Sequence, residues 1–393
     1  MPYVKKLQPH EFNFLHSKNI LLAKIDIELT ERCNNRCIHC CINQPENDEG
    51  SLLREMDTEL VKRILTEAAN LGCFTVKFTG GEPLLRKDFA EIYLFARRLG
   101  MQVILFTNAR LITPSLAGLF AKFPPGREIE VSVYGMSSES YDVVSGCSGS
   151  FLEFRQGVDL LLQYKVPFIV KGPLLYFLKE DQEAFEAWAE TIPSMDAKPG
   201  YSMNFELRSR RDDQTKNERI AKLRVTPEDT VAMFARNPYY IADMVRFCGN
   251  FIGPPGDKLF LCGAGQGSCC IDAYGHAQLC LPMRRTDTVI DLNKISLKKA
   301  IEESFPFIRE TKAKNPEYLR RCARCFLKGL CEQCPAKSWV EYGTLDTPIE
   351  YFCEIAHAQA RFLGLLSVSE SAWDVEDWKE RVKRFVEINS TVG

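Results

Sequence analysis

Three cysteines near the start of the chain have a spacing that suits metal binding. Cys33, Cys37 and Cys40 follow the pattern CxxxCxxC, directly after an apolar run. Three thiolates in this arrangement can bind one face of a [4Fe–4S] cluster, and because such a cluster normally takes four thiolates, one iron would stay open to another ligand. Zinc is the alternative, with His39 or Cys41 as a fourth ligand. The residue types alone leave both kinds of site open.

A glycine-rich turn follows the next strand-like run, where residues 79–83 read TGGEP. Glycines let a backbone approach a ligand closely, and Glu82 offers a carboxylate to a cationic amine. Alone, this motif would be read as an ordinary tight turn. Its place after the strand that follows the cysteine loop makes the two motifs together more specific, and it favours an iron–sulfur cluster over zinc.

The C-terminal part of the chain carries a denser cysteine pattern. Cys262 is followed by twelve residues, then Gly275, then four residues, then Cys280. Further along, residues 322–334 follow the pattern CxxCxxxxxCxxC, and Cys353 stands alone. The dense segment by itself would suit zinc, because CxxC pairs are common zinc ligands. The spacing therefore predicts metal binding without naming the metal.

These motifs lie in a chain that alternates strand-like and helix-like segments up to about residue 210. Such alternation predicts an α/β fold of parallel βα units, whose strand ends gather ligands at one edge. Six units predict an open or partial (β/α)6 barrel. The expected strands are residues 24–29, 74–79, 102–107, 129–134, 167–171 and 203–207, and the expected helices are residues 57–71, 87–99, 114–122, 151–164 and 180–192.

The composition limits the classes of function. The chain has 393 residues and a formal net charge of -2, which gives no reason to expect nucleic acid or an acidic membrane as a partner. We find no apolar run long enough to span a membrane and no secretory signal pattern, so we expect a cytoplasmic protein. Because a reducing compartment keeps thiols free, sixteen cysteines indicate metal binding rather than disulfides.

The cysteine loop and the TGGEP turn together resemble the radical S-adenosylmethionine (SAM) superfamily, over about residues 23–210. The resemblance implies that Cys33, Cys37 and Cys40 ligate a cluster whose open iron SAM chelates, with His39 beside the cluster. Electron transfer would cleave SAM to a 5′-deoxyadenosyl radical, which removes a hydrogen from a substrate. The residues implied to surround the methionine amino group are Gly80, Gly81, Glu82 and Pro83.

Four further side chains are expected to contact SAM. Ser132 and Tyr134 lie on the fourth strand, where relatives often place a polar residue at the ribose. Ser132 is the favoured contact, with a core-facing serine as the alternative. Asn108 ends the third strand and would contact the ribose or cap the following helix. Lys171 and Arg208, on or after the fifth and sixth strands, would meet the SAM carboxylate or lie solvated.

The cysteine-rich part resembles the SPASM extension of radical enzymes, over about residues 248–357. The resemblance implies two auxiliary [4Fe–4S] clusters, and three clusters in total. This chain has two residues between the last two cysteines of the dense run, where relatives usually have three. One auxiliary cluster would use Cys262, Cys269, Cys280 and Cys334, with Cys270 as the alternative to Cys269 and Cys248 as a substitute ligand. The other would use Cys322, Cys325, Cys331 and Cys353.

The predicted organisation has four parts. A lead-in covers residues 1–22, the radical SAM partial barrel residues 23–245, the small SPASM domain residues 246–357, and a helical tail residues 358–393. Within the barrel part, the charged residues 208–222 are expected to form a solvated linker or helix face.

The resemblance also bears on the substrate. SPASM relatives mostly crosslink, epimerise or oxidise ribosomally made peptides or proteins, so a peptide or protein substrate is expected, with a small metabolite such as a haem precursor or sugar as the alternative. An electron carrier without catalytic activity is a third hypothesis. Leu281 stands where sulfatase-maturing relatives carry Asp, which argues against that reaction. Because only about 22 residues precede the first strand, a separate leader-recognition protein or the barrel surface would bind a peptide. A ferredoxin or flavodoxin would supply electrons.

Overall fold

The computed structural model describes residues 22–175 and 179–389. Nine strands among these residues form one sheet, in the order β11-β10-β9-β1-β4-β5-β6-β7-β8. Neighbouring strands from β9 to β8 pair in parallel, whereas β10 pairs antiparallel with both β9 and β11. The strands are β1 (Lys24–Thr30), β4 (Thr75–Gly80), β5 (Gln102–Thr107), β6 (Ile129–Ser132), β7 (Phe168–Pro173), β8 (Gly200–Ser202), β9 (Ser268–Ile271), β10 (His276–Gln278) and β11 (Ile290–Asp291).

The two faces of the sheet differ in chemistry, as the alternation along each strand requires. On β1, Ile25 and Ile27 are fully buried in the main core. Asp26 lies between them on the opposite face and pairs with Lys77 of β4 at 2.6 Å. Helices therefore cover an apolar face, while charged side chains line the other.

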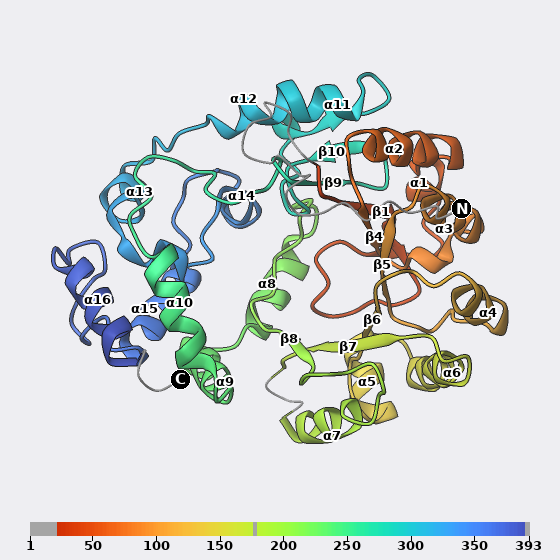
Figure 1. Cartoon of the computed structure of the whole chain (residues 1–393), viewed down its shortest axis with the longest axis horizontal. Coiled ribbons are helices and arrows are strands. Elements are labelled where there is room, and N and C mark those ends of the chain that lie inside the picture. Colours follow the sequence, from red (N-terminus) through yellow and green to blue (C-terminus); the bar gives the residue numbers. More distant parts are fainter. Residues whose placement is uncertain (1–21, 176–178, 390–393) are drawn as a thin grey trace, which may run out of the picture.

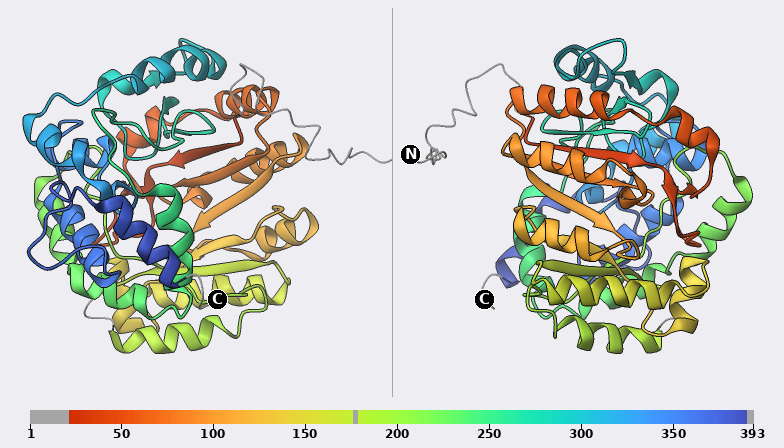
Figure 2. Two further views of the ribbon diagram at one scale, coloured as in Figure 1. Left: turned by 60° about the vertical axis from the view of Figure 1, so that its left-hand side comes forward. Right: turned by 90° about the vertical axis from the view of Figure 1, so that its right-hand side faces the viewer.

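Helices cover the outer face of this sheet (Figures 1 and 2). Several begin at the side chain that their sequence predicts: Asp57 accepts a hydrogen bond from the backbone N–H of Leu60, and Thr113 accepts one from that of Leu116. Ser137 and Ser140 form a capping box at a helix that the sequence pattern did not predict. The helices are α2 (Thr58–Asn70), α3 (Phe89–Arg98), α4 (Pro114–Lys122), α5 (Ser138–Ser145), α6 (Ser150–Gln163) and α7 (Lys179–Ala189).

The predicted α/β fold is confirmed, and the first five predicted strands lie where expected to within a few residues. The sixth is wrong: residues 203–207 form no strand, and β8 precedes them. Phe205 and Leu207 are buried because they pack with Ile220 and Val340 in a separate small core. The apolar alternation of this segment therefore reflects packing in the small core and not pairing within the sheet. The charged segment 208–222 contains most of helix α8 (Gln214–Leu223).

Most helices of the C-terminal third lie on the side of the strands away from α3, α4 and α6 (Figure 1), whereas the N–H of Leu297 donates to Glu67 of α2. The predicted boundaries at residues 245 and 357 fall inside α10 and α15, so they mark changes of composition rather than breaks in the backbone. Residues 1–21 of the predicted lead-in and residues 390–393 of the tail lie outside the described residues. The helices here are α9 (Pro227–Ala235), α10 (Tyr240–Phe251), α11 (Leu297–Lys299), α12 (Phe305–Arg309), α13 (Pro316–Arg320), α14 (Pro335–Tyr342), α15 (Glu350–Phe362) and α16 (Trp378–Asn389).

Three short elements follow β1 directly: β2 (Arg32–Cys33), β3 (Gln44–Pro45) and α1 (Glu49–Arg54). Strands β2 and β3 pair in parallel as a separate two-stranded sheet. Cys33 ends β2, and the loop between the two strands carries Cys37 and Cys40. Among the described helices, none has the length and apolar character that crossing a membrane requires.

Candidate functional site

The N-terminal cysteine loop is held by contacts from several elements. Backbone N–H groups of Arg36 and Ile38 donate to carbonyl oxygens at the end of α5, at 2.8 and 3.0 Å. The guanidinium of Arg110, just after β5, donates to the carbonyl oxygen of Asn34 and to the side chain of Asn35. The loop conformation is therefore set by parts of the chain far from it in sequence.

The three thiols of this loop lie close enough to influence one another. Burial, followed by the charge of Cys37, raises the pKa of Cys33 well above its usual range. Burial, followed by the charge of Cys40, raises the pKa of Cys37 to about 12. The backbone N–H of Asn35 donates to Cys33 Sγ at 3.3 Å. Because thiols lose their protons when they bind metal, a bound cluster would offset this mutual repulsion.

The described side chains do not form a site for a single metal ion. Among the described residues, no three His, Cys, Asp or Glu side chains converge closely enough to hold one metal ion. In a [4Fe–4S] cluster each thiolate binds its own iron, so the thiols stand farther apart than ligands of one zinc ion. The donor set at Cys33, Cys37 and Cys40 is therefore compatible with a [4Fe–4S] cluster.

His39, within the same loop, is packed among aromatic rings. Its ring centroid lies 5.7 Å from that of Tyr134 and 5.2 Å from that of Phe205. Burial, with a smaller effect from Lys216, lowers the pKa of His39 to about 4. The imidazole is therefore neutral at pH 7 and packs against the rings of Tyr134 and Phe205.

The glycines of the TGGEP turn allow two backbone segments to meet. The N–H of Gly81 donates to Thr30 O at 2.7 Å, and the N–H of Glu82 donates to Arg32 O at 2.9 Å. A Cβ at Gly80 would lie 2.0 Å from Thr30 O, and one at Gly81 would lie 2.1 Å from Arg32 O. These glycines are therefore required for the contact between the end of β4 and the chain that leads into the cysteine loop, a role that the sequence pattern did not predict.

The carboxylate of Glu82 is bound within the protein. Its Oε1 accepts hydrogen bonds from Thr107 Oγ1 at 2.9 Å and from the backbone N–H of Leu84 at 3.1 Å, and its Oε2 accepts one from the N–H of Asn108 at 2.9 Å. Burial raises the pKa of Glu82 to about 7 against the opposing effect of these bonds. Glu82 thus fixes the end of β5 beside the cysteine loop, and Pro83 begins the short turn that follows it.

Asn108 is the predicted SAM contact that the structure places at the cysteine loop. Its Nδ2 donates to Asn34 Oδ1 at 2.7 Å and lies 3.9 Å from Cys33 Sγ. The alternative that Asn108 caps the next helix is wrong, because Thr113 caps α4.

The other three predicted SAM contacts are placed differently. Ser132 ends β6 in register with Lys171 of β7. Lys171 Nζ pairs with Glu130 at 2.6 Å and lies 3.2 Å from the centre of the Phe106 ring. Arg208 pairs with Asp212 at 2.6 Å and donates to Asn43 O at 3.3 Å. Arg208 therefore contacts the chain just beyond the cysteine loop.

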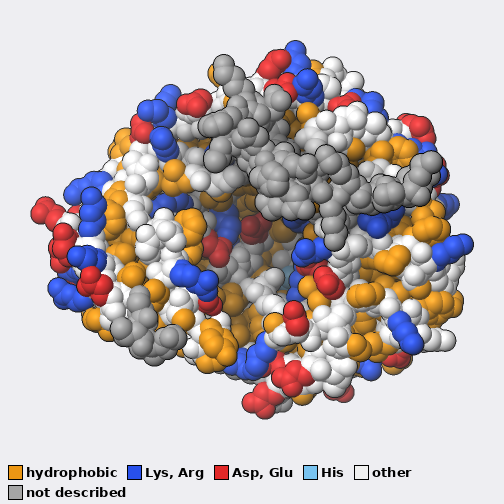
Figure 3. Space-filling model, viewed as in Figure 1, with side chains coloured by type: hydrophobic (Ala, Val, Ile, Leu, Met, Phe, Trp, Pro, Cys, Tyr) orange, Lys and Arg blue, Asp and Glu red, His pale blue; other side chains and the backbone are white. Residues whose placement is uncertain are grey.

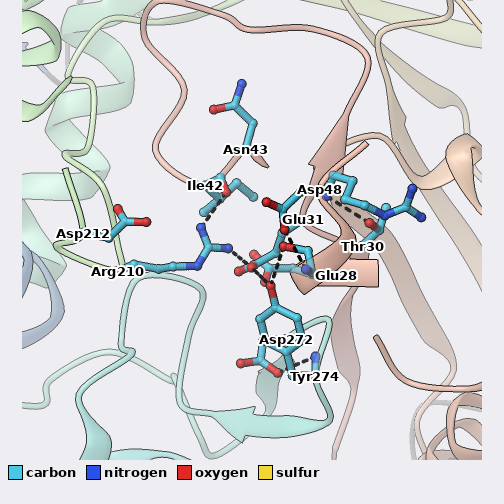
Figure 4. A network of polar contacts seen from close by, with 12 residues as sticks. Glu28, Thr30, Glu31, Ile42, Asn43, Asp48, Arg210, Asp212, Asp272 and Tyr274 are labelled. Atoms are coloured by element: carbon cyan, nitrogen blue, oxygen red, sulfur yellow. Dashed lines mark hydrogen bonds and ion pairs between the residues drawn. The ribbon is translucent and has the colours of Figure 1, made fainter. Parts of the chain in front are cut away.

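A buried ionic network lies next to the loop (Figure 4). Arg284 binds Glu28 at 2.6 Å and Glu31 at 2.7 Å, and both carboxylates are fully buried. Arg210 pairs with Glu31 and donates to Ile42 O at 2.9 Å, while the hydroxyl of Tyr274 also donates to Glu31. The network joins the end of β1 to the turn between β9 and β10, and its members are too far apart in sequence to be predicted as a group.

Four C-terminal cysteines line one cavity. We call them the second C-terminal group. Burial and the neighbouring thiols raise the pKa of both Cys322 and Cys325 to about 12. The backbone N–H of Gln333 donates to a third thiol at 3.4 Å. The structure thus brings together the set that the resemblance implied, namely Cys322, Cys325, Cys331 and Cys353.

The other set is only partly assembled. Cys262, Cys280 and Cys334, here called the first C-terminal group, interact: burial and the charges of Cys334, Glu206 and Cys262 raise the pKa of Cys280. Cys334 caps α14, where its Sγ accepts the backbone N–H of Lys337 at 3.4 Å. These three thiols lie near one another, with an acidic side chain beside them.

Cys269, the predicted fourth ligand of that set, is not placed with it. Cys269 pairs in register with Ile25 on β1 and lies in the main core, where burial, followed by the charge of Cys73, raises its pKa. Cys270 faces the opposite side of the strand, toward Glu28 and Arg284.

Cys248 does not serve as a substitute ligand in this structure. It is buried with Tyr240, Phe326 and Leu327 in a separate apolar core, and burial raises its pKa to about 11. It therefore packs as a small apolar side chain.

The barrel and the C-terminal part face each other across a hollow. The space-filling view shows basic and acidic side chains gathered within it (Figure 3). The charge of Glu206 acts both on Cys41 beside the barrel loop and on Cys280 of the first C-terminal group. The barrel loop and that group thus have a common acidic neighbour.

Comparison with known proteins agrees with this geometry. The chain is 31% identical over 141 residues to the AdoMet-dependent heme synthase of Methanosarcina barkeri, covering 36% of this chain and 39% of that protein. It is 38% identical over 120 residues to the PqqA peptide cyclase of Methylorubrum populi, covering 30% of each chain. The chain thus spans well under half the length of these curated relatives.

The fold extends beyond the barrel. The structure of Streptococcus suis SuiB bound to S-adenosylmethionine superposes with a TM-score of 0.61 at 17% identity, covering 85% of this chain and 77% of SuiB. Residues 27–192 match the family model described as the Radical SAM superfamily. The chain therefore carries a domain of the Radical SAM superfamily, within a fold that it shares with SuiB over most of its length.

Proposed function

We propose that this chain is a radical SAM enzyme that removes a hydrogen atom from a peptide or protein during post-translational modification. The observation that carries the radical chemistry is the loop with Cys33, Cys37 and Cys40, held against the end of β4 by the contacts of Gly80 and Gly81. Cys33, Cys37 and Cys40 would hold a [4Fe–4S] cluster, which when bound would supply the electron for cleavage of SAM to a 5′-deoxyadenosyl radical.

The chain's own residues orient and enclose this site. Asn108 and Arg110 fix the loop from β5, while the network of Glu31 with Arg210 and Arg284 fixes it from the C-terminal side. We propose that Asn108 and Ser132 contact the SAM ribose. The backbone of Gly80–Pro83 binds the methionine amino group, since the Glu82 carboxylate already accepts three hydrogen bonds.

Two auxiliary clusters complete the proposal. The second C-terminal group offers four thiols around one cavity, which suits a fully ligated cluster. The first C-terminal group offers three thiols, with a backbone N–H donor to one of them. We place the protein in the cytoplasm, where cysteines stay reduced and free to bind metal. All sixteen cysteines are unpaired.

A peptide substrate is favoured by the relatives. One is named PqqA peptide cyclase, another is Mycofactocin maturase MftC, and SuiB has been solved bound to its precursor peptide SuiA. On this proposal, a peptide would enter with or without a separate leader-recognition protein, and a ferredoxin or flavodoxin would supply electrons. The second candidate is a small metabolite, favoured by the identity to haem synthases and to probable GTP 3′,8-cyclases.

The test begins with protein reconstituted under anaerobic conditions. Three clusters predict about twelve irons and as many sulfides per chain, and 5′-deoxyadenosine should form with dithionite. Cys37→Ala should abolish that product, whereas Cys73→Ala, a buried cysteine outside the three groups, should retain it. Zinc without sulfide, or no 5′-deoxyadenosine in the wild type, would contradict the radical assignment.

The substrate class needs a separate comparison. Peptides encoded in neighbouring reading frames and an iron porphyrin precursor would each be added to the reduced enzyme. We expect a peptide to increase 5′-deoxyadenosine formation and to change in mass. Stimulation by the porphyrin alone would favour the metabolite candidate.

A further inference from the structure

The second C-terminal group has a charged hydrogen-bond donor directed at one of its thiols. Arg321 precedes the first cysteine of the group in sequence, and its Nη2 donates to the Sγ of the last one, Cys353, at 3.4 Å. The Arg321 side chain is only 12% exposed and lines the same cavity as the four thiols. A cation thus contacts a proposed cluster ligand from within the protein.

This guanidinium is held firmly in place. Nη1 and Nη2 of Arg321 bind the two carboxylate oxygens of Glu350 at 2.6 and 2.8 Å. On one face, Cζ lies 4.6 Å from the centre of the Trp373 ring. A paired and stacked guanidinium has little freedom to turn away, so the donor to Cys353 is fixed before any cluster binds.

Other polar groups at the cavity carry less charge or point elsewhere. His357 Nε2 accepts the backbone N–H of Ala372 at 3.1 Å, so the ring proton lies on Nδ1. Nδ1 donates to Cys353 O at 2.8 Å and lies 3.6 Å from Cys353 Sγ. That imidazole is neutral. The ammonium of Lys328 also lines the cavity and donates to the carbonyl oxygen of Gln333. Among the described side chains, Arg321 is the cation with a hydrogen bond to a thiol of this group.

The first C-terminal group differs in its charges. The carboxylate of Glu206 acts on both Cys280 and Cys334, and at Cys334 the charges of Lys337 and Lys328 oppose it. Lys337 lies near that carboxylate at 4.0 Å but pairs more closely with Glu332. An acidic side chain beside one group and a fixed arginine at the other should separate their reduction potentials, because these potentials depend on charge and on hydrogen bonds to sulfur.

We propose that Arg321 raises the reduction potential of the cluster in the second C-terminal group through its hydrogen bond to Cys353 Sγ, so that this cluster accepts an electron more readily than the first. The proposal rests on the proposed function, in that both groups hold clusters. Reduction adds one negative charge, which a fixed cation stabilises. Arg321 is a positioning and tuning residue and takes no part in the reaction of the substrate.

The test compares Arg321→Gln with Arg320→Gln in full-length protein. Arg320 is the adjacent arginine, but its side chain is 62% exposed and pairs with Glu317 only at the surface. Each protein is reconstituted, its iron and sulfide are counted, and its clusters are titrated with dithionite while electron paramagnetic resonance is recorded. The signal of the second group is identified as the one missing from Cys322→Ala/Cys325→Ala.

We expect Arg321→Gln to lower the ratio of reduced to oxidised second-group cluster about tenfold at a fixed potential, which equals a shift of about 59 mV for one electron. Arg320→Gln should titrate like the wild type. Arg321→Lys keeps the charge but cannot bind both Glu350 and Cys353 in the same way. Its reduction potential should therefore lie between those of the wild type and Arg321→Gln.

Each outcome bears on the proposal. An unchanged potential in Arg321→Gln with a full iron count would overturn the role of Arg321 and leave the proposed function intact. If the wild type itself lacks the irons of this group, the proposed function fails instead. If Arg321→Gln loses the cluster altogether, the titration of Arg321→Lys decides. A second-group reduction potential in Arg321→Lys equal to that of the wild type would also overturn the proposal.

Discussion

The two C-terminal cysteine groups are assembled in different ways. In the second group, three cysteines come from one compact segment between Cys322 and Cys331, and helix α15 adds Cys353, so four thiols line one cavity. In the first group, Cys262 and Cys280 flank strands β9 and β10, and a distant helix start adds a third thiol. The dense run therefore supplies three members of the complete set, but it also supplies Cys334 to the dispersed set, which depends in addition on which face of a strand each residue occupies.

The alternation of β9 explains why the dispersed set was harder to predict. Neighbouring residues on a strand point to opposite faces. Cys269 pairs with Ile25 and Cys270 pairs with Asp26, so one thiol enters the apolar core and the other faces the charged side of the sheet. The register with β1 decides between them, and the sequence pattern of β9 alone does not reveal that register.

The largest expected effect tests the complete group. Cys322→Ala/Cys325→Ala should remove about four of about twelve irons, because this group should no longer hold its cluster. The barrel loop is untouched, so 5′-deoxyadenosine should still form with dithionite. Iron, sulfide and product assays measure this, with Cys73→Ala as the control. A full iron count in the double variant would show that these thiols hold no cluster.

The next effect concerns how the barrel group is held. Gly81→Ala places a methyl group against Arg32 O, which must move, and we expect the free energy of unfolding to fall by about 2–4 kcal/mol. Gly200→Ala is the matched control, since a Cβ at Gly200 meets no atom within 4 Å. Urea unfolding of both variants in metal-free form gives the comparison. Equal midpoints would mean that the close contact is not required.

A smaller effect is expected in the first C-terminal group, whose cysteines are dispersed along the sequence. Because Cys269 lies in the core, Cys269→Ala should keep the full iron count and lose about 1 kcal/mol of stability through a small cavity. Cys262→Ala should instead lose about four irons, as a member of the first group. If Cys269→Ala loses iron as Cys262→Ala does, strand β9 must rearrange when the cluster binds, and the predicted ligand set stands.

The smallest effect is a pH dependence at the barrel loop. The pKa of His39 is lowered to about 4 from its ordinary 6.5, so the unfolded chain takes up the proton first as the pH falls. Its contribution to stability is therefore present above pH 6.5 and is lost toward pH 4, at roughly 1 kcal/mol per pH unit. His39→Phe should lose less stability between pH 6.5 and 5.5 than the wild type.

A second histidine provides the control for that measurement. Asp272 raises the pKa of His276, so His276 contributes stability below its ordinary pKa and loses that contribution as the pH rises. His276→Asn should therefore change the profile in the direction opposite to His39→Phe. Identical urea midpoints for His39→Phe and the wild type at both pH values would mean that His39 is not buried in neutral form.

Much of the fold could be predicted because it depends on local patterns. The apolar alternation of β1 and β4 and the capping residues Asp57 and Thr113 are short-range signals, and the structure agrees with them. The CxxC spacing of the second group is equally local. The sixth strand was placed too late because Phe205 and Leu207 alternate for a different reason, namely packing against α8 and α14.

The contacts around the site could not be predicted in the same way. Arg284 and Glu28 are 256 residues apart, and nothing near either of them indicates a partner. Arg110 reaches the cysteine loop only because β5 and the loop meet at the same end of the sheet. The sequence also suggests a free carboxylate at Glu82, and only the fold shows that Thr107 and Asn108 occupy it.

The parallel pairing of β1 with β9 also affects how the chain is made. Lys24–Thr30 leaves the ribosome early, but Ser268–Ile271, which covers one of its edges, is synthesised much later. Until then, β1 has unpaired backbone groups on that edge, which is the arrangement that invites association between chains. Such long-range parallel pairing is also slow to form. The nascent barrel therefore stays incomplete until the C-terminal part emerges, so the yield of folded protein should depend on an intact β9 even where β9 supplies no metal ligand.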